Sequence, residues 1–227
     1  MAQRETFTNK VAKTSRAQAK VERRLALIEA TVETIAVYGL SGTTIARVTE
    51  IAGTSVGLAN FHFENKERLF EAVLRHLAEN EKAALQEHLE KAPDDPAHRL
   101  LALIEARFDP RILNPKTAAV WFAFWGDASA RSIYRRVVAT TDDARLATFV
   151  PVLESLLAEH DGPVRDAYDM ALGMEAFYDG LWLNYLLYPD DYRRVECRKR
   201  AIDHLISLFP QHIDALSVAD SVACEAA

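Results

Sequence analysis

The chain has few residues that interrupt helices and few that could cross-link the chain. Among its 227 residues there are only eight glycines, eight prolines and two cysteines. Scarce helix breakers, together with abundant Ala, Leu, Glu and Arg, favour an all-helical fold. No stretch alternates apolar and polar residues between turn signals, so we expect no β-sheet. Cys197 and Cys224 are far apart without a CxxC spacing, which supports neither a disulfide framework nor a zinc site and is typical of a reducing cytoplasm.

Signals for export, for membrane insertion and for catalysis are also missing. The N-terminus has no apolar core of signal-peptide length, and no run approaches the ~20 apolar residues that span a membrane. We therefore expect a soluble cytoplasmic protein without a membrane partner. The seven histidines and the many carboxylates show no metal-ligand or triad spacing, and no glycine-rich phosphate loop is present. We predict that the protein is not an enzyme and has no catalytic residues, no metal and no cofactor.

Charge is divided unevenly along the chain. The formal net charge is −6, which by itself argues against a nucleic-acid partner. Residues 1–68, however, hold ten Lys/Arg and seven Asp/Glu, a net charge of +3, and the remainder holds seventeen and twenty-six, a net charge of −9. A basic N-terminal unit on an acidic body fits contact with DNA at one end only.

Residues 43–67, TTIARVTEIAGTSVGLANFHFENKE, show the pattern of two short helices and the start of a third. Ile45, Val48 and Ile51 recur at helical spacing, so one face of the first short helix should pack inward. Three helix starts each have a side chain that can cap them: Thr43 or Thr44, Ser55 and Asn65. Gly53 can take the positive φ that ends the first short helix. This is the layout of a helix-turn-helix, which presents its second helix to the DNA major groove. A plain helical hairpin shares the apolar spacing but not the caps.

These residues, with the ENKERLF start of the following helix, resemble TetR-family transcriptional repressors over about residues 22–75. The segments FDPRILNPKTAAVWFAFWGDAS (108–129), SIYRRV (132–137) and YDGLWLNYLL (178–187) are similar to the choline-responsive repressors of glycine-betaine synthesis, the BetI group of that family. The resemblance implies an all-helical homodimer that binds a palindromic operator and responds to a small molecule, here choline or a related amine. A helical enzyme, or a helical interaction protein that has lost DNA binding, is the alternative function.

The sequence predicts that the chain is divided into four parts. We expect a basic, disordered arm over 1–20, a three-helix helix-turn-helix domain over 21–68, a ligand-binding and dimerisation domain over 69–213, and a frayed tail over 214–227. The arm could add phosphate contacts. Expected helices cover about 17–38, 65–93, 96–108, 115–129, 131–160, 164–187 and 190–209, with Gly39 closing the first and Pro151 kinking or splitting the fifth.

The candidate DNA contacts divide into two kinds, because phosphate contacts fix register and base contacts carry sequence information. The phosphate candidates are Thr44, Lys66 and His62, with Thr43 sharing the role. The base-edge candidates are Ser55, Val56, Gly57 and Asn60, where Asn60 can pair with an adenine and Val56 can meet a thymine methyl. Phe61 is a further candidate, although it and Phe63 could instead pack in the core. The family commonly has a tyrosine where this chain has His62, which leaves the operator sequence in doubt.

The candidate ligand site is aromatic. Four aromatic residues crowd the segment 121–125, and Glu175, Asp179 and Trp182 fall on one face of a later helix. Aromatic faces beside a carboxylate suit a quaternary ammonium ion through cation–π attraction. The candidates are Phe108, Trp121, Phe124, Trp125, Tyr134, Met174, Tyr178, Asp179 and Trp182. The alternatives are that single members belong to the core and that Asp179 pairs with an arginine.

The resemblance also implies a dimer. In the family, the last two helices, here about 164–187 and 190–209, meet their twofold copies in a four-helix bundle. Two recognition helices would then lie roughly one DNA turn (~34 Å) apart.

Overall fold

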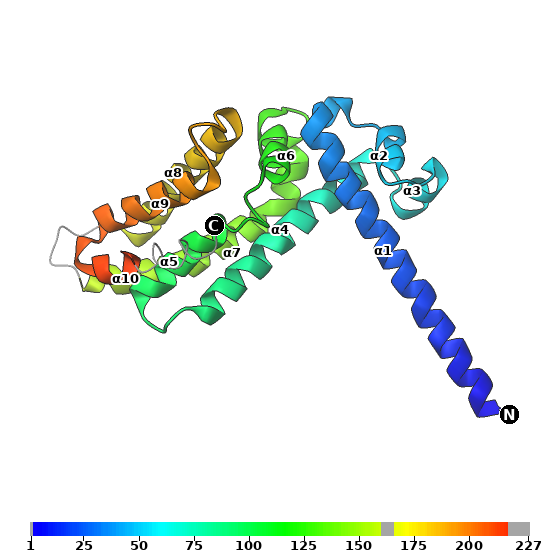
Figure 1. Cartoon of the computed structure of the whole chain (residues 1–227), viewed down its shortest axis with the longest axis horizontal. Helices are drawn as coiled ribbons and strands as arrows, with labels where there is room; N and C mark the ends of the chain where they lie inside the picture. The colour runs from blue at the N-terminus through cyan, green and yellow to red at the C-terminus, as the bar shows by residue number, and fades with distance from the viewer. Residues whose placement is uncertain (1, 160–165, 218–227) are drawn as a thin grey trace.

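The computed structural model describes residues 2–159 and 166–217, with side chains from residue 17 onward, and within these residues the secondary structure is entirely helical (Figure 1). The first three helices are α1 (Ala2–Gly42), α2 (Ile45–Ile51) and α3 (Val56–His62). The larger second part comprises α4 (Lys66–Lys91), α5 (Pro96–Arg107), α6 (Pro115–Gly126), α7 (Arg131–Ala158), α8 (Ala167–Leu187), α9 (Arg194–Leu208), a 3₁₀ turn (Pro210–His212) and α10 (Ile213–Ser217).

Helix α1 is longer than the sequence predicted. It begins at Ala2, so the segment expected to be a disordered arm is drawn as a rod that extends away from the rest of the molecule (Figure 1). Residues 2–38 contain neither glycine nor proline, so nothing in this stretch interrupts a helix. The helical path breaks at Gly39, whose φ of 66° is in the left-handed region that favours glycine.

The other boundaries lie close to the predicted ones, with two differences. Pro151 neither ends nor divides α7, which runs through it to Ala158. The predicted tail begins as helix α10, in which Leu216 is buried; residues 218–227 lie outside the described residues. The expected helix start at 164 also lies outside them, and α8 is described from Ala167.

The apolar part of α1 supplies the core of the first domain. By length and composition the stretch Ala17–Gly42 could cross a membrane, which the sequence prediction did not recognise. In the fold it packs on α2, α4 and α6 and buries Leu27, Ile28 and Ile35. A core helix of a water-soluble domain has the same composition, and this packing accounts for the buried apolar residues of the stretch, while Val21 and Val37 are exposed.

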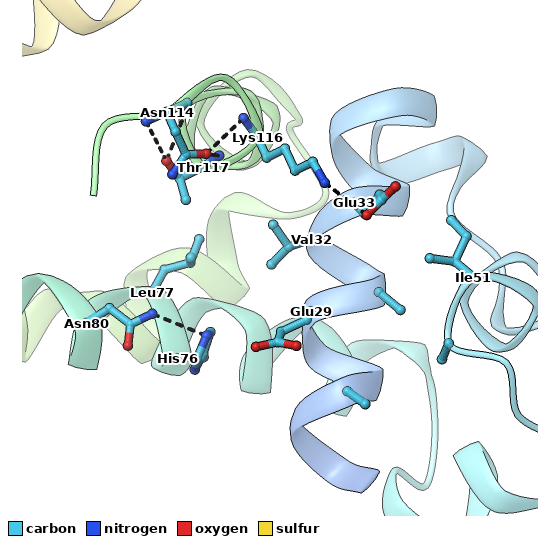
Figure 2. Close-up of a pocket in the computed structure, with 13 residues that line it drawn as sticks. Glu29, Val32, Glu33, Ile51, His76, Leu77, Asn80, Asn114, Lys116 and Thr117 are labelled. Carbon is cyan, nitrogen blue, oxygen red and sulfur yellow. Dashed lines mark hydrogen bonds and ion pairs between the residues drawn. The ribbon is translucent and has the colours of Figure 1, made fainter. Parts of the chain in front are cut away.

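The two domains meet along α1, α4 and α6. A groove of about 550 Å³ lies on the outside of this junction, lined from both domains (Figure 2). Ile51, predicted to face inward, is 41% exposed because it faces this groove. Lys116 Nζ of α6 reaches Glu33 Oε2 of α1 at 2.9 Å, so an ion pair spans the junction (Figure 2).

Candidate DNA-binding and ligand-binding sites

Side-chain caps set the geometry of the helix-turn-helix. Thr44 Oγ1 accepts from Arg47 N at 3.3 Å, Ser55 Oγ from Leu58 N at 3.2 Å, and Asn65 Oδ1 from Arg68 N at 2.9 Å. Gly53 has a φ of 61°, as the predicted turn requires. These caps are local consequences of the sequence, since each satisfies an N–H three residues away.

Helix α3 presents its predicted base-reading side to solvent. Ser55, Val56, Gly57 and Asn60 are all exposed, while Ala59 packs inward. Phe61 is 69% exposed, so the alternative that it packs in the core is wrong, whereas Phe63 is buried as expected.

Gly57 has no structural reason to be glycine. A Cβ added there would meet only Ser55 Oγ, at 3.9 Å. The fold therefore gives no reason for a residue that weakens the helix, and its close approach to DNA stays a prediction.

Two of the phosphate candidates are engaged inside the domain. Thr43 is 1% exposed and its hydroxyl donates to Gly39 O at 2.7 Å, so it stabilises the end of α1 and does not face solvent. Lys66 Nζ donates to Leu40 O at 2.8 Å and lies 5.0 Å from the Phe70 ring centroid. An ammonium group has three donors, so Lys66 keeps donors for a phosphate, but Thr43 does not.

The structure brings additional basic side chains to the end of the recognition helix. Lys20 Nζ lies 5.3 Å from the Phe61 ring centroid, and Arg24 lies 5.1 Å from that of Phe63. Partial burial lowers the pKa of His62, and the charges of Lys20, Arg24 and Arg23 lower it further. The sequence prediction placed Lys20 in the arm and did not identify Arg23 or Arg24, although the net charge of residues 1–68 pointed to such a surface.

A small cavity of about 20 Å³ lies where α4, α5, α6, α7 and α8 meet. Five of the nine predicted ligand residues line it: Trp121, Trp125, Tyr134, Asp179 and Trp182. The rings of Trp121 and Trp125 each meet the Tyr134 ring edge-to-face with centroids 6.1 Å apart. Tyr134 therefore packs edge to face against both indole rings at the cavity.

The other four predicted residues are core residues. Phe108, Phe124, Met174 and Tyr178 are buried and do not line this cavity. Phe124 packs on Phe70 with ring centroids 5.6 Å apart, and Phe108 on Tyr178 at 6.3 Å. Their apolar spacing was that of any buried helix face, so the sequence could not separate core from cavity.

A group of ionised side chains, which we call the charged cluster, lies against the aromatic cavity; its members are Glu81, Arg107, Asp142, Arg145, Glu175 and Asp179. Arg107 pairs with Asp179 at 2.7 Å and with Glu175 at 3.4 Å. The predicted alternative that Asp179 pairs with an arginine is therefore confirmed.

Arg145 holds the rest of the cluster together. It pairs with Glu175 at 2.9 Å, with Asp142 at 3.0 Å and with Glu81 at 3.7 Å. The cluster therefore contains four carboxyl groups and two guanidinium groups. Of these six residues the sequence analysis singled out only Glu175 and Asp179, because the others come from helices whose packing it could not foresee.

Carboxyl groups outnumber guanidinium groups in the cluster, and the pKa values of two of the carboxyl groups are raised. Burial raises the pKa of Glu81, and the neighbouring carboxylates of Asp142 and Glu175 raise it further, against the opposing charges of Arg107 and Arg145. Burial likewise raises the pKa of Asp142. An additional cation here would stabilise the ionised carboxylates.

Arg107 occupies the position that such a cation would take. Its guanidinium carbon lies 5.0 Å from the Trp182 ring centroid while Nη2 contacts Asp179. A guanidinium over an indole face, beside a carboxylate, is the same combination of interactions that holds a quaternary ammonium ligand.

Two family models match the chain. The tetR family of bacterial regulatory proteins matches residues 27–73, and the C-terminal domain of BetI-type transcriptional repressors matches residues 96–210. The chain belongs to the TetR family, with a BetI-type C-terminal domain. It is a transcriptional repressor of that type, and the expectation that it is not an enzyme agrees with these two families and with relatives named as transcriptional regulators.

Relatives and solved structures give the same assignment. The regulator BetI of Burkholderia thailandensis is 32% identical over 183 residues, which cover 81% of this chain and 91% of that protein. BetI of Paraburkholderia phymatum is 33% identical over 83% of this chain and 94% of its own length.

Two crystal structures extend the comparison to the fold. A transcriptional regulator from Pseudomonas aeruginosa PAO1 has a TM-score of 0.71 with 28% identity, covering 84% of this chain and 92% of that one. A regulator from Saccharomonospora viridis in complex with choline has a TM-score of 0.69 with 22% identity, covering 82% and 96%.

Proposed function

We propose that this repressor binds a palindromic operator as a homodimer in the cytoplasm, and that choline or a related small amine changes its operator affinity. We infer a cationic effector from the surplus of carboxyl groups over guanidinium groups beside three tryptophans. A cation compensates the surplus, whereas an anion would add to it. The choline bound to the Saccharomonospora viridis regulator supports the same ligand class.

Choline would also find a hydrogen-bond donor in the cavity. Trp182 Nε1 is buried and has no hydrogen-bond partner among the described residues. A buried donor without a partner is costly, so a ligand hydroxyl that accepts from it contributes to binding. The cation would displace Arg107 from Trp182 and Asp179, which couples ligand binding to a rearrangement between α5 and α8.

The dimer proposal rests on an exposed apolar stripe along α8. Tyr168, Leu172, Leu183 and Leu187 are all exposed. Gly173 and Gly180 lie on the same helix with open space beside them, so another backbone could approach closely there. Ala171 and Leu181 of the same helix are buried in the chain's own core, so they do not belong to this stripe.

For DNA we propose that Ser55, Val56, Gly57, Asn60 and Phe61 face the major groove. Thr44, His62 and Lys66 would contact phosphates, and Thr43 is removed from that set because it is buried. Lys20, Arg23 and Arg24 extend the basic surface.

A mobility-shift assay on the DNA upstream of the protein's own gene tests the function. We expect retention that survives competitor DNA, and a change of about 5- to 150-fold in operator affinity on adding choline. The control is 3,3-dimethylbutanol, which has the shape of choline without the charge and should have little effect. Loss of all retention under competitor would reject operator binding, and equal effects of the two compounds would reject the cation site.

Sedimentation of a Leu172→Glu, Leu187→Glu variant tests the dimer. Charges on the stripe should yield monomers and abolish operator retention, whereas Ile213→Glu, an exposed apolar residue on α10, should remain dimeric. A variant that stays dimeric would place the interface elsewhere.

A further inference from the structure

A second and larger cavity lies next to the aromatic one, between α4, α5 and α7. It has a volume of about 370 Å³, within the range of small-molecule sites, whereas the aromatic cavity has room for about one water molecule. We call it the α4–α5–α7 cleft. An effector of even modest size therefore finds more space here than between the tryptophans.

The walls of the cleft are apolar and its rim is polar. Leu103, Ile112 and Phe149 are buried at its inner end, and the half-buried Leu85 and Leu89 also line it. Exposed residues at its mouth include Lys82, Gln86, Thr140 and Ala144. Leucine side chains left partly uncovered inside a domain gain stability from any apolar group that covers them.

The two cavities meet at the charged cluster. Glu81, Arg107 and Arg145 line both of them. A ligand whose charged end lies at the cluster can therefore extend an apolar chain into the cleft without crossing a wall of core residues.

We propose that the effector is an amphipathic cation, with a quaternary or tertiary ammonium head beside Trp121, Trp125 and Trp182 and an apolar chain in the α4–α5–α7 cleft. This rests on the proposed function and narrows its ligand class from small amines to amines that carry an alkyl or acyl chain. The site takes choline as its smallest member.

The charges of the cluster select a cation over an anion with the same chain. Arg107 and Arg145 are each bonded to at least two carboxyl groups, so neither guanidinium is unpaired. A carboxylate head would add a fifth acidic group to the cluster, while an ammonium head compensates the acid surplus and can replace Arg107 beside Asp179.

Calorimetric titration of the full chain with tetramethyl-, propyltrimethyl-, butyltrimethyl- and hexyltrimethylammonium tests the proposal. We expect the affinity to rise by about threefold for each methylene that enters the cleft. Pentanoate and heptanoate, which carry the same butyl and hexyl chains, are the matched anions and should bind more weakly than the corresponding cations. No dependence on chain length, or tighter binding of the carboxylates, would overturn the proposal.

An Ala144→Trp variant locates the chain. Ala144 is exposed on α7 at the mouth of the cleft, so a larger side chain can fill the cleft without repacking the core. This variant should lose the chain-length dependence and keep the affinity for choline. Ala147→Trp, on the same helix but outside the cleft, is the control and should behave as the parent protein. Equal chain-length dependence in both variants would place the chain elsewhere and reject the proposal.

The operator assay separates this inference from the proposed function. If choline alters operator binding and longer chains bring no gain in affinity, the function stands and the inference fails. If the chain-length series binds and Ala144→Trp abolishes its trend, the ligand class and its place in the cleft stand, and an operator affinity that does not respond then rejects only the effector role.

Discussion

The helix-turn-helix and the ligand site of this protein are built in opposite ways. The predicted base contacts come from one continuous segment, residues 55–61, and the caps of the helix-turn-helix connect residues three positions apart. The aromatic cavity and the charged cluster take side chains from five helices, α4 to α8. A surface site made of local structure follows from local sequence, whereas a buried site depends on how distant helices pack.

Arg107→Ala should have the largest effect on stability, because Arg107 is buried and pairs with both Asp179 and Glu175. Removing this guanidinium leaves Asp179 without its partner and Glu175 with Arg145 alone, and we expect a loss of about 3–5 kcal/mol in the free energy of unfolding. Urea denaturation followed by circular dichroism measures it. Choline should stabilise this variant more than the parent, since a cation then replaces the missing charge.

Two further variants make that result specific. Arg135→Ala removes an exposed arginine and should change stability by less than about 0.5 kcal/mol. Arg107→Lys keeps a charge without the planar fork and should be intermediate. If the alanine variant is as stable as the parent, or gains nothing extra from choline, Arg107 does not occupy the ligand position.

Asn60→Ala tests the surface site, where we expect operator affinity to fall while the free energy of unfolding stays the same. Loss of a bidentate pair with an adenine should lower specific operator affinity by about 10- to 100-fold. Unfolding should be unaffected because Asn60 is exposed. Asn80→Ala, an exposed asparagine on α4, is the control in the same binding assay, and equal losses in both would argue against a base contact.

The pH dependence of cation binding should be smaller and should come only from the buried site. Burial raises the pKa of Glu81 and of Asp142, and a bound cation favours their ionised forms, so binding releases protons. The affinity for choline should therefore rise with pH through the raised pKa values, by at most about tenfold per pH unit for each proton released.

The control for this experiment removes the charge of Glu81 and keeps the charged groups around it. Arg107, Arg145, Asp142 and Glu175 surround it and are kept in a Glu81→Gln variant, which should show a weaker pH dependence. Calorimetry in two buffers with different ionisation enthalpies counts the protons. A pH profile that the variant leaves unchanged would assign the titration to another group.

Gly57→Ala should change stability and operator affinity in opposite directions. The added methyl group meets open space and raises helix propensity, so we expect a gain of about 0.5 kcal/mol. Operator affinity should nevertheless fall, because the methyl group occupies the surface that approaches DNA. Tighter or unchanged operator binding would show that Gly57 does not lie against the duplex.

The sequence could not distinguish the residues that line the cavity from those that pack in the core. Trp121 and Phe124 belong to one apolar helix and have the same kind of pattern, yet Trp121 lines the cavity and Phe124 packs on Phe70. Arg107 and Arg145 gave no signal at all, since an arginine in a helical sequence is ordinarily an exposed residue. Which side of a buried helix faces a cavity depends on every helix around it.

The sequence by itself determined the helical fold, the helix-turn-helix with its caps, the family and the aromatic character of the helix around residues 121–125. These are properties of neighbouring residues, of periodicity and of composition. Only the tertiary structure decided that Thr43 is buried, that Arg107 lies on Trp182 between Asp179 and Glu175, and that a cleft opens beside the cluster. Those features arise from side chains far apart in the chain, and their energies exist only once the helices have packed.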